Sequence, residues 1–465
     1  MSVGRKTRSR LQYEFRIPLP HTGDLPELLY AVILPRKGGF FVEKCAMSIT
    51  NGQEAVEYIH GYSWLGSKPG LGRTKALLNA IDNPEQKLKF VHVVGTNGKG
   101  STSSMVASML RADCKRAGLY TSPFIRRFHE RMVVNGEEIS DSELVEVTRF
   151  VGEKADKLEE HPTEFELVTC IALEHYRRKK CDYVVLEAGM GGRLDSTNAI
   201  PTPEVVVITN IGLDHTGVLG DTVEAIAAEK AAVIKPGCKV VLYRQSESVM
   251  DVVRRICDEQ GAELHIAGIE DMELVSDTLD GQRIRWKGKE LLLPLLGEHQ
   301  RHNAAVALTV AEVLGLSEQA VADGLAAARW PGRFEVLHKN PWFIVDGGHN
   351  PQCAETVAYN LNYYFHGKPA VILIGVLADK DYSEVCSIVE PYAGQFVAVT
   401  PDSYRALSAD DLAKQLSRYG KPVTPCASVS EGVKCALELA GKDGLVCAFG
   451  SLYMTGEIRG YFGLE

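Results

Sequence analysis

The sequence predicts an α/β protein in which parallel sheets form two successive domains. Short apolar runs rich in β-branched residues alternate with helical patterns from Met47 to the end of the sequence. Runs that are apolar throughout indicate parallel strands whose sheets are covered on both faces. A Trp-Pro-Gly break at residues 329–333 ends one strand–helix series, and a second series follows it. A length of 465 residues is enough for two or three domains.

The order of these elements sets the predicted domain boundaries. We expect strands at residues 90–94, 183–186, 205–209, 239–243, 343–345, 370–374, 396–399 and 445–448. Helical patterns between them are clearest at residues 101–111, 222–234 and 303–314. The large domain is therefore predicted at residues 47–330 and the smaller α/β domain at residues 334–465.

Residues 1–46 differ from the rest of the chain in having several arginines and prolines and no sustained period. We interpret them as a loosely ordered extension, or as a misassigned start with Met47 as the true first residue. The acidic residues Glu14, Asp24 and Glu27 argue against the alternative of a mitochondrial-type presequence.

Composition excludes several classes of function. A formal charge of −9 and a pI near 5.9 argue against nucleic-acid binding. An anionic substrate would therefore need basic residues placed locally. No apolar stretch has the length of a membrane span. The eleven cysteines are scattered, without zinc-ligand spacing, and indicate reduced thiols in a cytoplasmic protein. A monomer is the default expectation.

The clearest chemical motif is Gly95-Thr-Asn-Gly-Lys-Gly-Ser101, between a predicted strand and a predicted helix. Such a turn presents backbone N–H groups to phosphate at the helix N-terminus. Lys99 would neutralise the outer phosphates, and the Ser101 hydroxyl could bind Mg²⁺. The spacing departs from the usual one because Gly100 separates the lysine from the serine. The alternative is a plain Gly/Asn turn.

Polar residues also follow two other predicted strands of the large domain. Glu187, at the end of one strand, is a candidate Mg²⁺ ligand. His215 follows the next strand, and Lys230 lies in the helical run after it. Taken alone, a strand-end glutamate is more often solvated or ion-paired, His215 reads as a structural histidine, and Lys230 reads as a solvated helix lysine.

The smaller domain repeats the arrangement of a strand followed by a polar turn. The turns are at residues 346–351, 379–381 and 449–453, and they contain Asp346, His349 and Ser451. Reactive groups at carboxyl ends of strands in both domains predict a site in the cleft between the two domains.

Taken together, these segments resemble the folylpolyglutamate synthase/dihydrofolate synthase family, a branch of the Mur ligase superfamily. The resemblance runs from about Met47 to the C-terminus. It rests on ordered motifs at residues 95–101, 120–123, 130–131, 135–136, 187–198, 210–215, 229–230, 302–303, 331–334, 346–351, 379–381 and 450–453. It implies a P-loop-containing, Mur-ligase-like central domain followed by a smaller Rossmann-like C-terminal domain.

The resemblance also implies roles for individual residues. ATP would be held by Lys99 with its neighbours Gly98, Gly100 and Ser101, and by Asn303, Arg333 and Asp346. Two Mg²⁺ ions are implied, with a monovalent cation as an optional addition. The metal ligands would be Ser122 and Glu187, with Ser101 nearby and His215 at the second ion. Lys230 is expected to be carbamylated, because an ammonium group 4 Å from a divalent ion would meet roughly 8 kcal/mol of repulsion. Lys99, Lys230 and His349 are the candidate catalytic residues.

The implied substrates are L-glutamate and either a folate or dihydropteroate. Arg131, His349 and Ser451 would receive the glutamate. The segment containing Thr163, Phe165 and Glu166, together with residues 68–73, resembles segments near the pterin. Phe124 and His129 depart from the residues usual in the family at a substrate loop, which leaves the pterin preference open.

The implied activity is ATP-dependent ligation through an acyl phosphate, giving polyglutamylated tetrahydrofolate, dihydrofolate, or both. Two alternatives stay open. One is another Mur-type ligase, against which the stretch between Met47 and Gly95 is short for an additional nucleotide-sugar domain. The other is a non-catalytic nucleotide switch, against which no Asn-Lys-x-Asp motif occurs.

Overall fold

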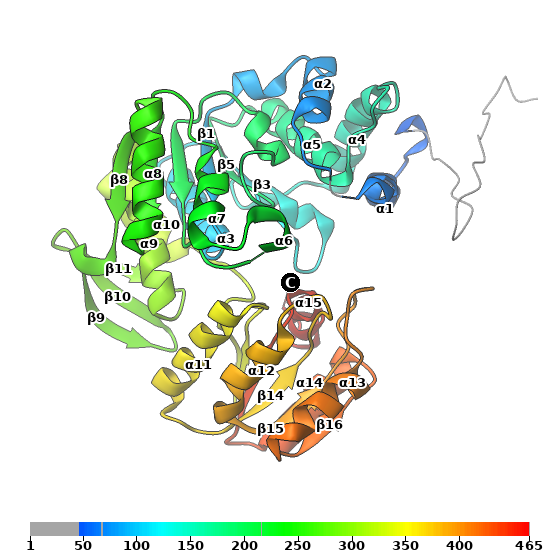
Figure 1. Cartoon of the computed structure of the whole chain (residues 1–465), viewed down its shortest axis with the longest axis vertical. Helices are drawn as coiled ribbons and strands as arrows, with labels where there is room; N and C mark the ends of the chain where they lie inside the picture. The colour runs from blue at the N-terminus through cyan, green and yellow to red at the C-terminus, as the bar shows by residue number, and fades with distance from the viewer. Residues whose placement is uncertain (1–45, 67, 215, 465) are drawn as a thin grey trace, which may run out of the picture. The chain divides into compact units, whose positions relative to one another are not determined.

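A computed structural model describes residues 46–66, 68–214 and 216–464 of the chain, which belong to one compact unit. The larger of its sheets has eight strands in the order β4-β3-β2-β5-β1-β6-β7-β8 (Figure 1). These strands are β1 Phe90–Val94, β2 Ala117–Tyr120, β3 Met132–Val134, β4 Glu137–Glu138, β5 Tyr183–Glu187, β6 Val205–Ile208, β7 Lys239–Tyr243 and β8 Glu263–Ala267. Six strands run parallel, namely β2, β5, β1, β6, β7 and β8. Beside β2, the strands β3 and β4 extend the sheet in antiparallel pairing.

Both faces of this sheet are buried, because successive side chains of each strand point to opposite sides. Val91 and Val93 face one apolar layer, whereas Phe90 and Val94 face the layers on the opposite side. The first face is covered by α3 Lys99–Ala112 and α9 Glu298–Val313, with α10 Glu318–Ala327 packed on α3. The opposite face carries α1 Gly52–His60, α2 Gly72–Ala80, α4 Asp141–Ala155, α5 Glu164–Arg178, α7 Val223–Ala231 and α8 Glu247–Gln260, and the short α6 Thr216–Leu219 precedes α7.

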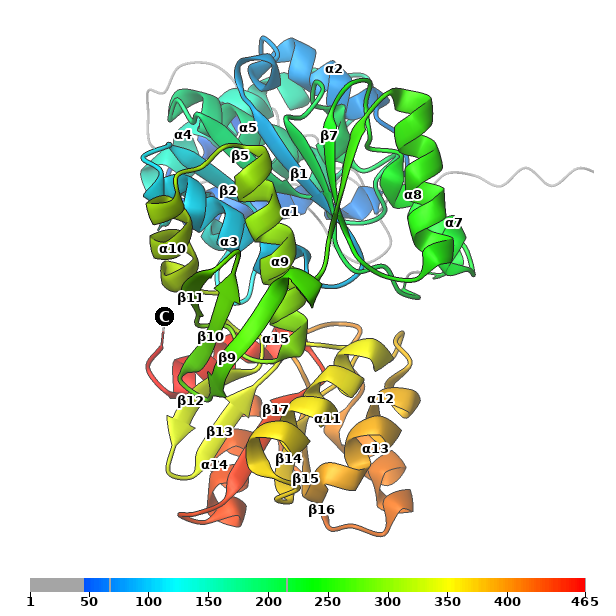
Figure 2. The same ribbon diagram turned by 90° about the vertical axis from the view of Figure 1, so that its left-hand side faces the viewer.

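A three-stranded antiparallel sheet precedes α9, and the sequence analysis did not predict it. It consists of β9 Met272–Thr278, β10 Gly281–Trp286 and β11 Lys289–Leu293. Ile284, Trp286 and Leu293 pack into the same apolar cluster as α9 and α10. Figure 2 shows the three strands next to these two helices. The sheet therefore extends the layer of helices instead of forming a core of its own.

The remaining sheet has six strands in the order β12-β13-β17-β14-β15-β16, of which β12 is antiparallel to β13. Its strands are β12 Glu335–Lys339, β13 Trp342–Val345, β14 Ala370–Ile374, β15 Ala393–Ala398, β16 Val423–Pro425 and β17 Leu445–Phe449. One face packs on α11 Pro351–Phe365, α12 Tyr382–Val389 and α13 Ala409–Leu416. The other face packs on α14 Val429–Ala440 and α15 Leu452–Tyr461 (Figure 1).

The predicted α/β class is confirmed, and each of the eight strands expected from the sequence corresponds to an observed strand within a few residues. The strands β3, β4 and β12 are antiparallel additions at one side of the expected parallel sheets. The boundaries at residues 47–330 and 334–465 remain predictions, and the expectation for residues 1–46 falls almost wholly outside the described residues. Over the described part of the chain, no helix has the length and apolar character needed to cross a membrane.

Candidate active site

Strand order explains where the polar turns gather. β1 lies between β5 and β6, and β5 lies next to β2. The carboxyl ends of parallel strands meet at one edge of a sheet. The turn after β1 is therefore flanked by Glu187 at the end of β5 and by Asn210 after β6, and Ser122 follows β2.

The turn after β1 has the geometry of a phosphate-binding loop. Gly98 is the residue before α3 and has a left-handed φ of 86°. A Cβ at this position would lie 2.3 Å from Oδ1 of Asn303, so only glycine fits. Lys99 Nζ donates to the carbonyl oxygens of Gly95 and Thr96, both at 3.1 Å. The amine of Lys99 therefore lies over its own loop, at the N-terminus of a 14-residue helix.

The second residue of the loop's Thr-Asn pair, Asn97, contacts the start of α11. The Nδ2 atom of Asn97 donates to Oε1 of Gln352 at 2.5 Å, and Asn350 Nδ2 donates to Oδ1 of Asn97 at 3.2 Å. The sequence analysis did not single out Asn97 or Gln352, because a contact over more than 250 positions leaves no local pattern. These bonds join the phosphate loop to the segment that carries Asp346 and His349.

Ser101 and Asn303, both predicted to lie at the nucleotide, are brought together by one glutamine. Gln300 Nε2 donates to the Ser101 hydroxyl at 3.2 Å, and Asn303 Nδ2 donates to Gln300 Oε1 at 3.1 Å. Ser101, Gln300 and Asn303 are all buried. Gln300 was missed because a single glutamine on a helix carries no chemical signature in a sequence.

Two buried ionisable side chains, Glu187 and Lys230, lie at the edge of this loop. The Glu187 side chain is 4% exposed, and its Oε2 accepts the backbone N–H of Ser122 at 3.2 Å. Burial raises the pKa of Glu187, and the positive charges of Lys99 and Arg333 and the Ser122 N–H oppose the rise. Lys230 is also 4% exposed, and its Nζ donates to the carbonyl oxygen of Gly95 at 2.8 Å. Burial, and after it the charge of Lys99, lowers the pKa of Lys230 to about 7.

Asp346 and Arg333 provide a second carboxylate and a second basic group, next to the six-stranded sheet. Asp346 follows β13 and accepts the backbone N–H of Phe334 at 2.8 Å and that of Gly348 at 2.7 Å. Burial raises the pKa of Asp346, and the neighbouring Arg333 charge opposes it. Ser451 follows β17, is buried, and caps α15 through the N–H of Tyr453. His349 lies in the same turn as Asp346 and is half-buried.

A cavity of about 440 Å³ brings several of these residues to one surface. Gly100, Ser122, Glu187 and Arg333 were predicted from the sequence and line it. The cavity is also lined by Arg111, Arg126, Arg329 and Trp330, which the sequence analysis did not identify as site residues. The cavity thus joins the edge of the phosphate loop to an apolar and basic wall.

The predicted substrate residues are placed in different surroundings. The Arg131 guanidinium lies 5.5 Å from the ring centres of both Phe124 and Phe128. Thr163 is the N-cap of α5 and forms a capping box with Glu166, which also accepts two hydrogen bonds from Arg73. The polar groups of Thr163 and Glu166 are thus used to begin a helix.

The remaining predicted residues around the loop are explained by packing or are not described. The Phe165 ring packs so close to Gly189 that a Cβ there would lie 2.5 Å away. His215 lies outside the described residues, and its predicted role at a second metal ion stays a prediction.

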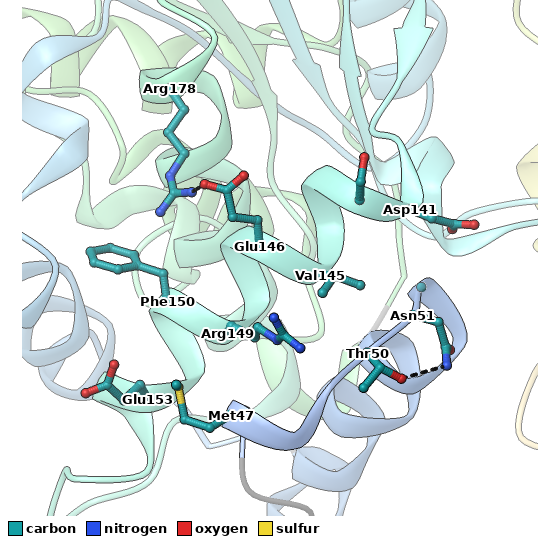
Figure 3. Close-up of a pocket in the computed structure, with 12 residues that line it drawn as sticks. Met47, Thr50, Asn51, Asp141, Val145, Glu146, Arg149, Phe150, Glu153 and Arg178 are labelled. Carbon is teal, nitrogen blue, oxygen red and sulfur yellow. Dashed lines mark hydrogen bonds and ion pairs between the residues drawn. The ribbon is translucent and has the colours of Figure 1, made fainter.

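A second cavity of about 710 Å³ lies between the start of α1 and one face of α4 (Figure 3). Its wall includes Arg149, Phe150 and the ion pair of Arg178 with Glu146. None of the predicted site residues lines it. Its greater volume does not outweigh the absence of motif residues, so we take the cavity beside the phosphate loop as the candidate site.

The fold and this site are those of a Mur ligase, and comparison with known families agrees. The Mur ligase middle domain matches residues 93–311, and the Mur ligase glutamate ligase domain matches residues 332–452. Among curated relatives, the dihydrofolate synthase/folylpolyglutamate synthase of Bacillus subtilis is 35% identical over 428 residues, covering 88% of this chain and 98% of the relative. The folylpolyglutamate synthase of Lacticaseibacillus casei is 35% identical over 77% of this chain and 87% of its own.

Solved structures give the same result. Folylpolyglutamate synthase of Mycobacterium tuberculosis, complexed with ADP and AMPPCP, superposes with a TM-score of 0.81 at 29% identity, covering 89% of this chain and 99% of its own. The Escherichia coli FolC protein in complex with DHPP and ADP gives a TM-score of 0.78 at 27% identity, covering 89% and 98%. The chain therefore belongs to the folylpolyglutamate synthase/dihydrofolate synthase family of Mur ligases, and the resemblance found in the sequence is confirmed.

Proposed function

We propose that this chain is an ATP-dependent ligase that joins L-glutamate to a tetrahydrofolate, to dihydropteroate, or to both. The observation that carries the proposal is the 440 Å³ cavity, where the phosphate-loop residue Gly100, the buried Glu187 and Arg333 share one wall. A phosphate cradle, a buried carboxylate and a guanidinium at one surface suit phosphoryl transfer to an acceptor carboxylate. The names of the relatives supply the substrates.

Activation is needed because the oxide of a carboxylate is a poor leaving group. In the proposed reaction the γ-phosphate of ATP is transferred to the acceptor carboxylate, which gives an acyl phosphate. The neutral amine of glutamate then attacks the acyl carbon, and inorganic phosphate leaves. Lys99 exchanges its carbonyl partners in the loop for phosphate oxygens. The N–H groups at the start of α3 hold the same phosphates, and Asn303, Arg333 and Asp346 complete the nucleotide site.

The residues present fit a divalent cation beside Glu187. Among the described residues no lysine or arginine forms an ion pair with Glu187, although its side chain is buried. A buried carboxylate without a direct counter-ion is costly, and a bound cation removes that cost. We assign Ser122 and Glu187 to one Mg²⁺, with Ser101 nearby, and Lys230 and His215 to the second. Magnesium, when bound, neutralises phosphate charge as it moves to the acceptor.

Lys230 is suited to carry a carbamate. A neutral amine is the form that adds to CO₂, and burial favours the neutral form of Lys230 by lowering its pKa to about 7. In this addition the nitrogen forms a bond to the CO₂ carbon and releases one proton. The resulting anionic oxygen could bind Mg²⁺, which the ammonium group would repel.

We assign the incoming glutamate to Arg131, His349 and Ser451. The guanidinium would pair with a glutamate carboxylate, and His349 would orient or deprotonate the amine. Thr163, Phe165 and Glu166, at the N-terminus of α5, are assigned to the neighbourhood of the pterin on the family resemblance. We propose a monomeric enzyme of the cytoplasm, in keeping with the free thiols of the described cysteines.

The test is to incubate the purified chain with Mg–ATP, L-glutamate and either dihydropteroate or tetrahydrofolate, and to follow products by mass spectrometry and phosphate release. We expect a product heavier by one glutamyl residue, and phosphate release only when acceptor and glutamate are both present. Phosphate release without either substrate would instead identify a nucleotide switch. Conjugation of a different acceptor would identify another Mur-type ligase.

A phosphate-loop variant provides a second test of the same proposal. Lys99→Ala removes the amine that the loop offers to the phosphates, so turnover should fall by at least about 10³-fold. Substantial activity in this variant would remove the phosphate-binding role of the loop. Lys115→Ala, at a partly exposed position after the same helix, is the matched control and should turn over like the original chain.

A further inference from the structure

The side chain of Asn97 in the phosphate loop is held by residues at the start of α11. Its Nδ2 atom donates to Oε1 of Gln352 at 2.5 Å, and its Oδ1 atom accepts Nδ2 of Asn350 at 3.2 Å. The Cys353 thiol donates to the same Oδ1 atom at 3.5 Å. One carboxamide of the loop therefore has three partners in a distant segment of the chain. We call these four residues the Asn97 clasp.

The backbone of Asn97 is anchored to the residues that follow β6. Its N–H group donates to the carbonyl oxygen of Asn210 at 3.3 Å, and its carbonyl oxygen accepts the Thr209 hydroxyl at 2.8 Å. Gly95, at the start of the loop, lies so close to Thr209 that a Cβ would meet its hydroxyl oxygen at 1.8 Å. Because the backbone is anchored in this way, a shift of α11 would either break the clasp or move the phosphate loop.

Gln352 also lies against a second loop of the eight-stranded sheet. A Cβ on Gly212 would lie 2.7 Å from Oε1 of Gln352. Gly212 is itself joined to the phosphate loop, because its N–H group donates to the Thr96 hydroxyl at 3.1 Å and its carbonyl oxygen accepts that hydroxyl at 3.1 Å. Gln352 is nevertheless an exposed residue. Its substitution should therefore leave the apolar core, and with it the fold, intact.

The turn between β13 and α11 connects the clasp to His349. Asp346 accepts the N–H group of Gly348 at 2.7 Å, and a Cβ on Gly348 would lie 2.6 Å from Cβ of Cys353. On the other side of His349, the buried Asn350 caps α11 by accepting the N–H group of Cys353 at 2.9 Å. Both neighbours of His349 are thus fixed, so the position of its backbone depends on the position of the clasp.

We propose that Gln352 is a positioning residue that acts through the Asn97 clasp and fixes His349 relative to the bound phosphates for attack by the glutamate amine. The inference rests on the proposed function and concerns the second step of that reaction. In this step the amine nitrogen forms a bond to the acyl carbon, the bond from that carbon to the phosphate oxygen breaks, and one proton passes from the nitrogen to His349. A misplacement of about 1 Å can slow such a step about 10²-fold.

The two steps of the reaction should depend on the clasp to different extents. Lys99 and the start of α3 hold the phosphates for the first step, and both belong to the phosphate loop itself. His349 reaches the loop only through another segment, so the second step should suffer more when the clasp is lost. Water would then attack the waiting acyl carbon, and phosphate would leave while the acceptor carboxylate is regenerated. Phosphate is then released without a glutamyl product.

The test measures phosphate release and glutamyl product in one reaction of the full chain with Mg–ATP, L-glutamate and the acceptor that the unsubstituted chain uses. Release without acceptor is subtracted, and the unsubstituted chain should then release equal amounts of phosphate and product. Gln352→Met keeps the length of the side chain and removes the accepting oxygen. Product formation should fall about fivefold, and the ratio of phosphate to product should rise to about 3 or more. The KM of ATP should change by less than about twofold, because the residues of the loop are unchanged.

Two further variants control for the accepting oxygen and for the helix surface. Gln352→Glu keeps an oxygen that accepts the Asn97 amide, so the ratio of phosphate to product should stay near that of the unsubstituted chain. Glu355→Met introduces the same residue at an exposed position on α11 and should change neither the rate nor the ratio. Thermal midpoints verify that each variant is folded.

Failure of the inference can be told apart from failure of the proposed function. If the unsubstituted chain forms no glutamyl product, the proposed function fails and the role of the clasp fails with it. If it forms product and the ratio is unchanged in Gln352→Met, only the role of the clasp fails, whether or not the rate has fallen. A ratio that rises as much in Gln352→Glu or in Glu355→Met would also overturn the inference, because the accepting oxygen would then not be the cause.

Discussion

At the scale of single residues, Lys230 shows how burial changes the chemistry of a side chain. An exposed lysine is protonated at neutral pH, whereas burial lowers the pKa of Lys230 to about 7. Lys235, in the same part of the chain, also has a lowered pKa, about 8, and donates to the carbonyl oxygen of Asn198 at 3.1 Å. Only Lys230 reaches the phosphate loop, through the carbonyl of Gly95. The two lysines therefore allow a matched comparison.

We expect Lys230→Ala to lose at least about 10³-fold in turnover, because the proposed carbamate and the contact with the loop are both removed. Short carboxylic acids such as acetate should restore part of the activity by supplying the missing oxygen. Lys235→Ala should show no such rescue. Steady-state rates with and without added acid measure both effects, and full activity of Lys230→Ala would exclude the carbamate role.

The residue scale also marks what the sequence could predict. Gly98, Lys99 and Ser101 could be predicted, because a glycine-rich turn before a helix is a known phosphate-binding motif. Lys230 and Glu187 could be assigned only through the family resemblance, because nothing in the flanking residues tells a buried lysine from a solvated one. Gln300, Asn97 and Gln352 were missed, since their partners lie far away in the chain.

At the scale of secondary-structure elements, the start of α5 depends on a buried ion pair. Arg73 donates to both oxygens of Glu166 at 3.0 and 2.9 Å, and the two side chains are 14% and 5% exposed. Arg73→Ala should lower the free energy of unfolding by about 3 kcal/mol, because a buried carboxylate loses its partner. Urea unfolding measures the change. Lys157→Ala, which breaks an exposed pair with Glu153 at the end of α4, should leave stability unchanged.

Strand β1 carries a buried histidine that makes stability depend on pH. Burial, with a smaller effect of the Lys235 charge, lowers the pKa of His92 to about 3. Between its ordinary value of about 6.5 and that value, the unfolded chain binds a proton that the folded chain does not. Stability should therefore fall as the pH falls through this window, by roughly 2 kcal/mol from this group between pH 6.5 and 4.5.

The variant His92→Asn tests that expectation, because asparagine keeps a polar partner for the Thr197 hydroxyl without titrating. Urea unfolding at pH 7 and pH 4.5 should show a smaller loss of stability for the variant than for the original chain. An equal loss in both proteins would show that other groups cause the acid sensitivity.

Elements were predicted unevenly, for a physical reason. Strands such as β1, β6 and β14 are buried on both faces, so their apolar runs stand out in the sequence. In contrast, β9 is partly or fully exposed along its length, and its residues 272–278 are mostly polar. Its partner β10 contributes Ile284 and Trp286 to the core from one face only. A single alternating strand of this kind is a weak signal.

At the scale of the whole described unit, polar side-chain contacts join the segments around the two large sheets. Lys380, after β14, forms an ion pair with Asp214, after β6, at 3.0 Å, and each side chain is 17% exposed. A double-mutant cycle with Lys380→Gln and Asp214→Asn should give a coupling free energy of about 1 kcal/mol in urea unfolding, smaller at high salt. The exposed pair of Lys414 and Asp411 on α13 should give no measurable coupling.

The 440 Å³ cavity beside the phosphate loop is built from segments that are distant in the sequence, since its wall includes Gly100, Glu187, Trp330 and Arg459. Neither large sheet supplies the whole wall. Catalysis should consequently be more fragile than secondary structure. On gradual denaturation, an early separation of the segments after Pro331 from α3 would abolish turnover while most of the circular-dichroism signal persisted. Loss of enzymatic activity would then be the most sensitive measure of partial unfolding. Two half-chains produced separately would each be inactive until they reassociated.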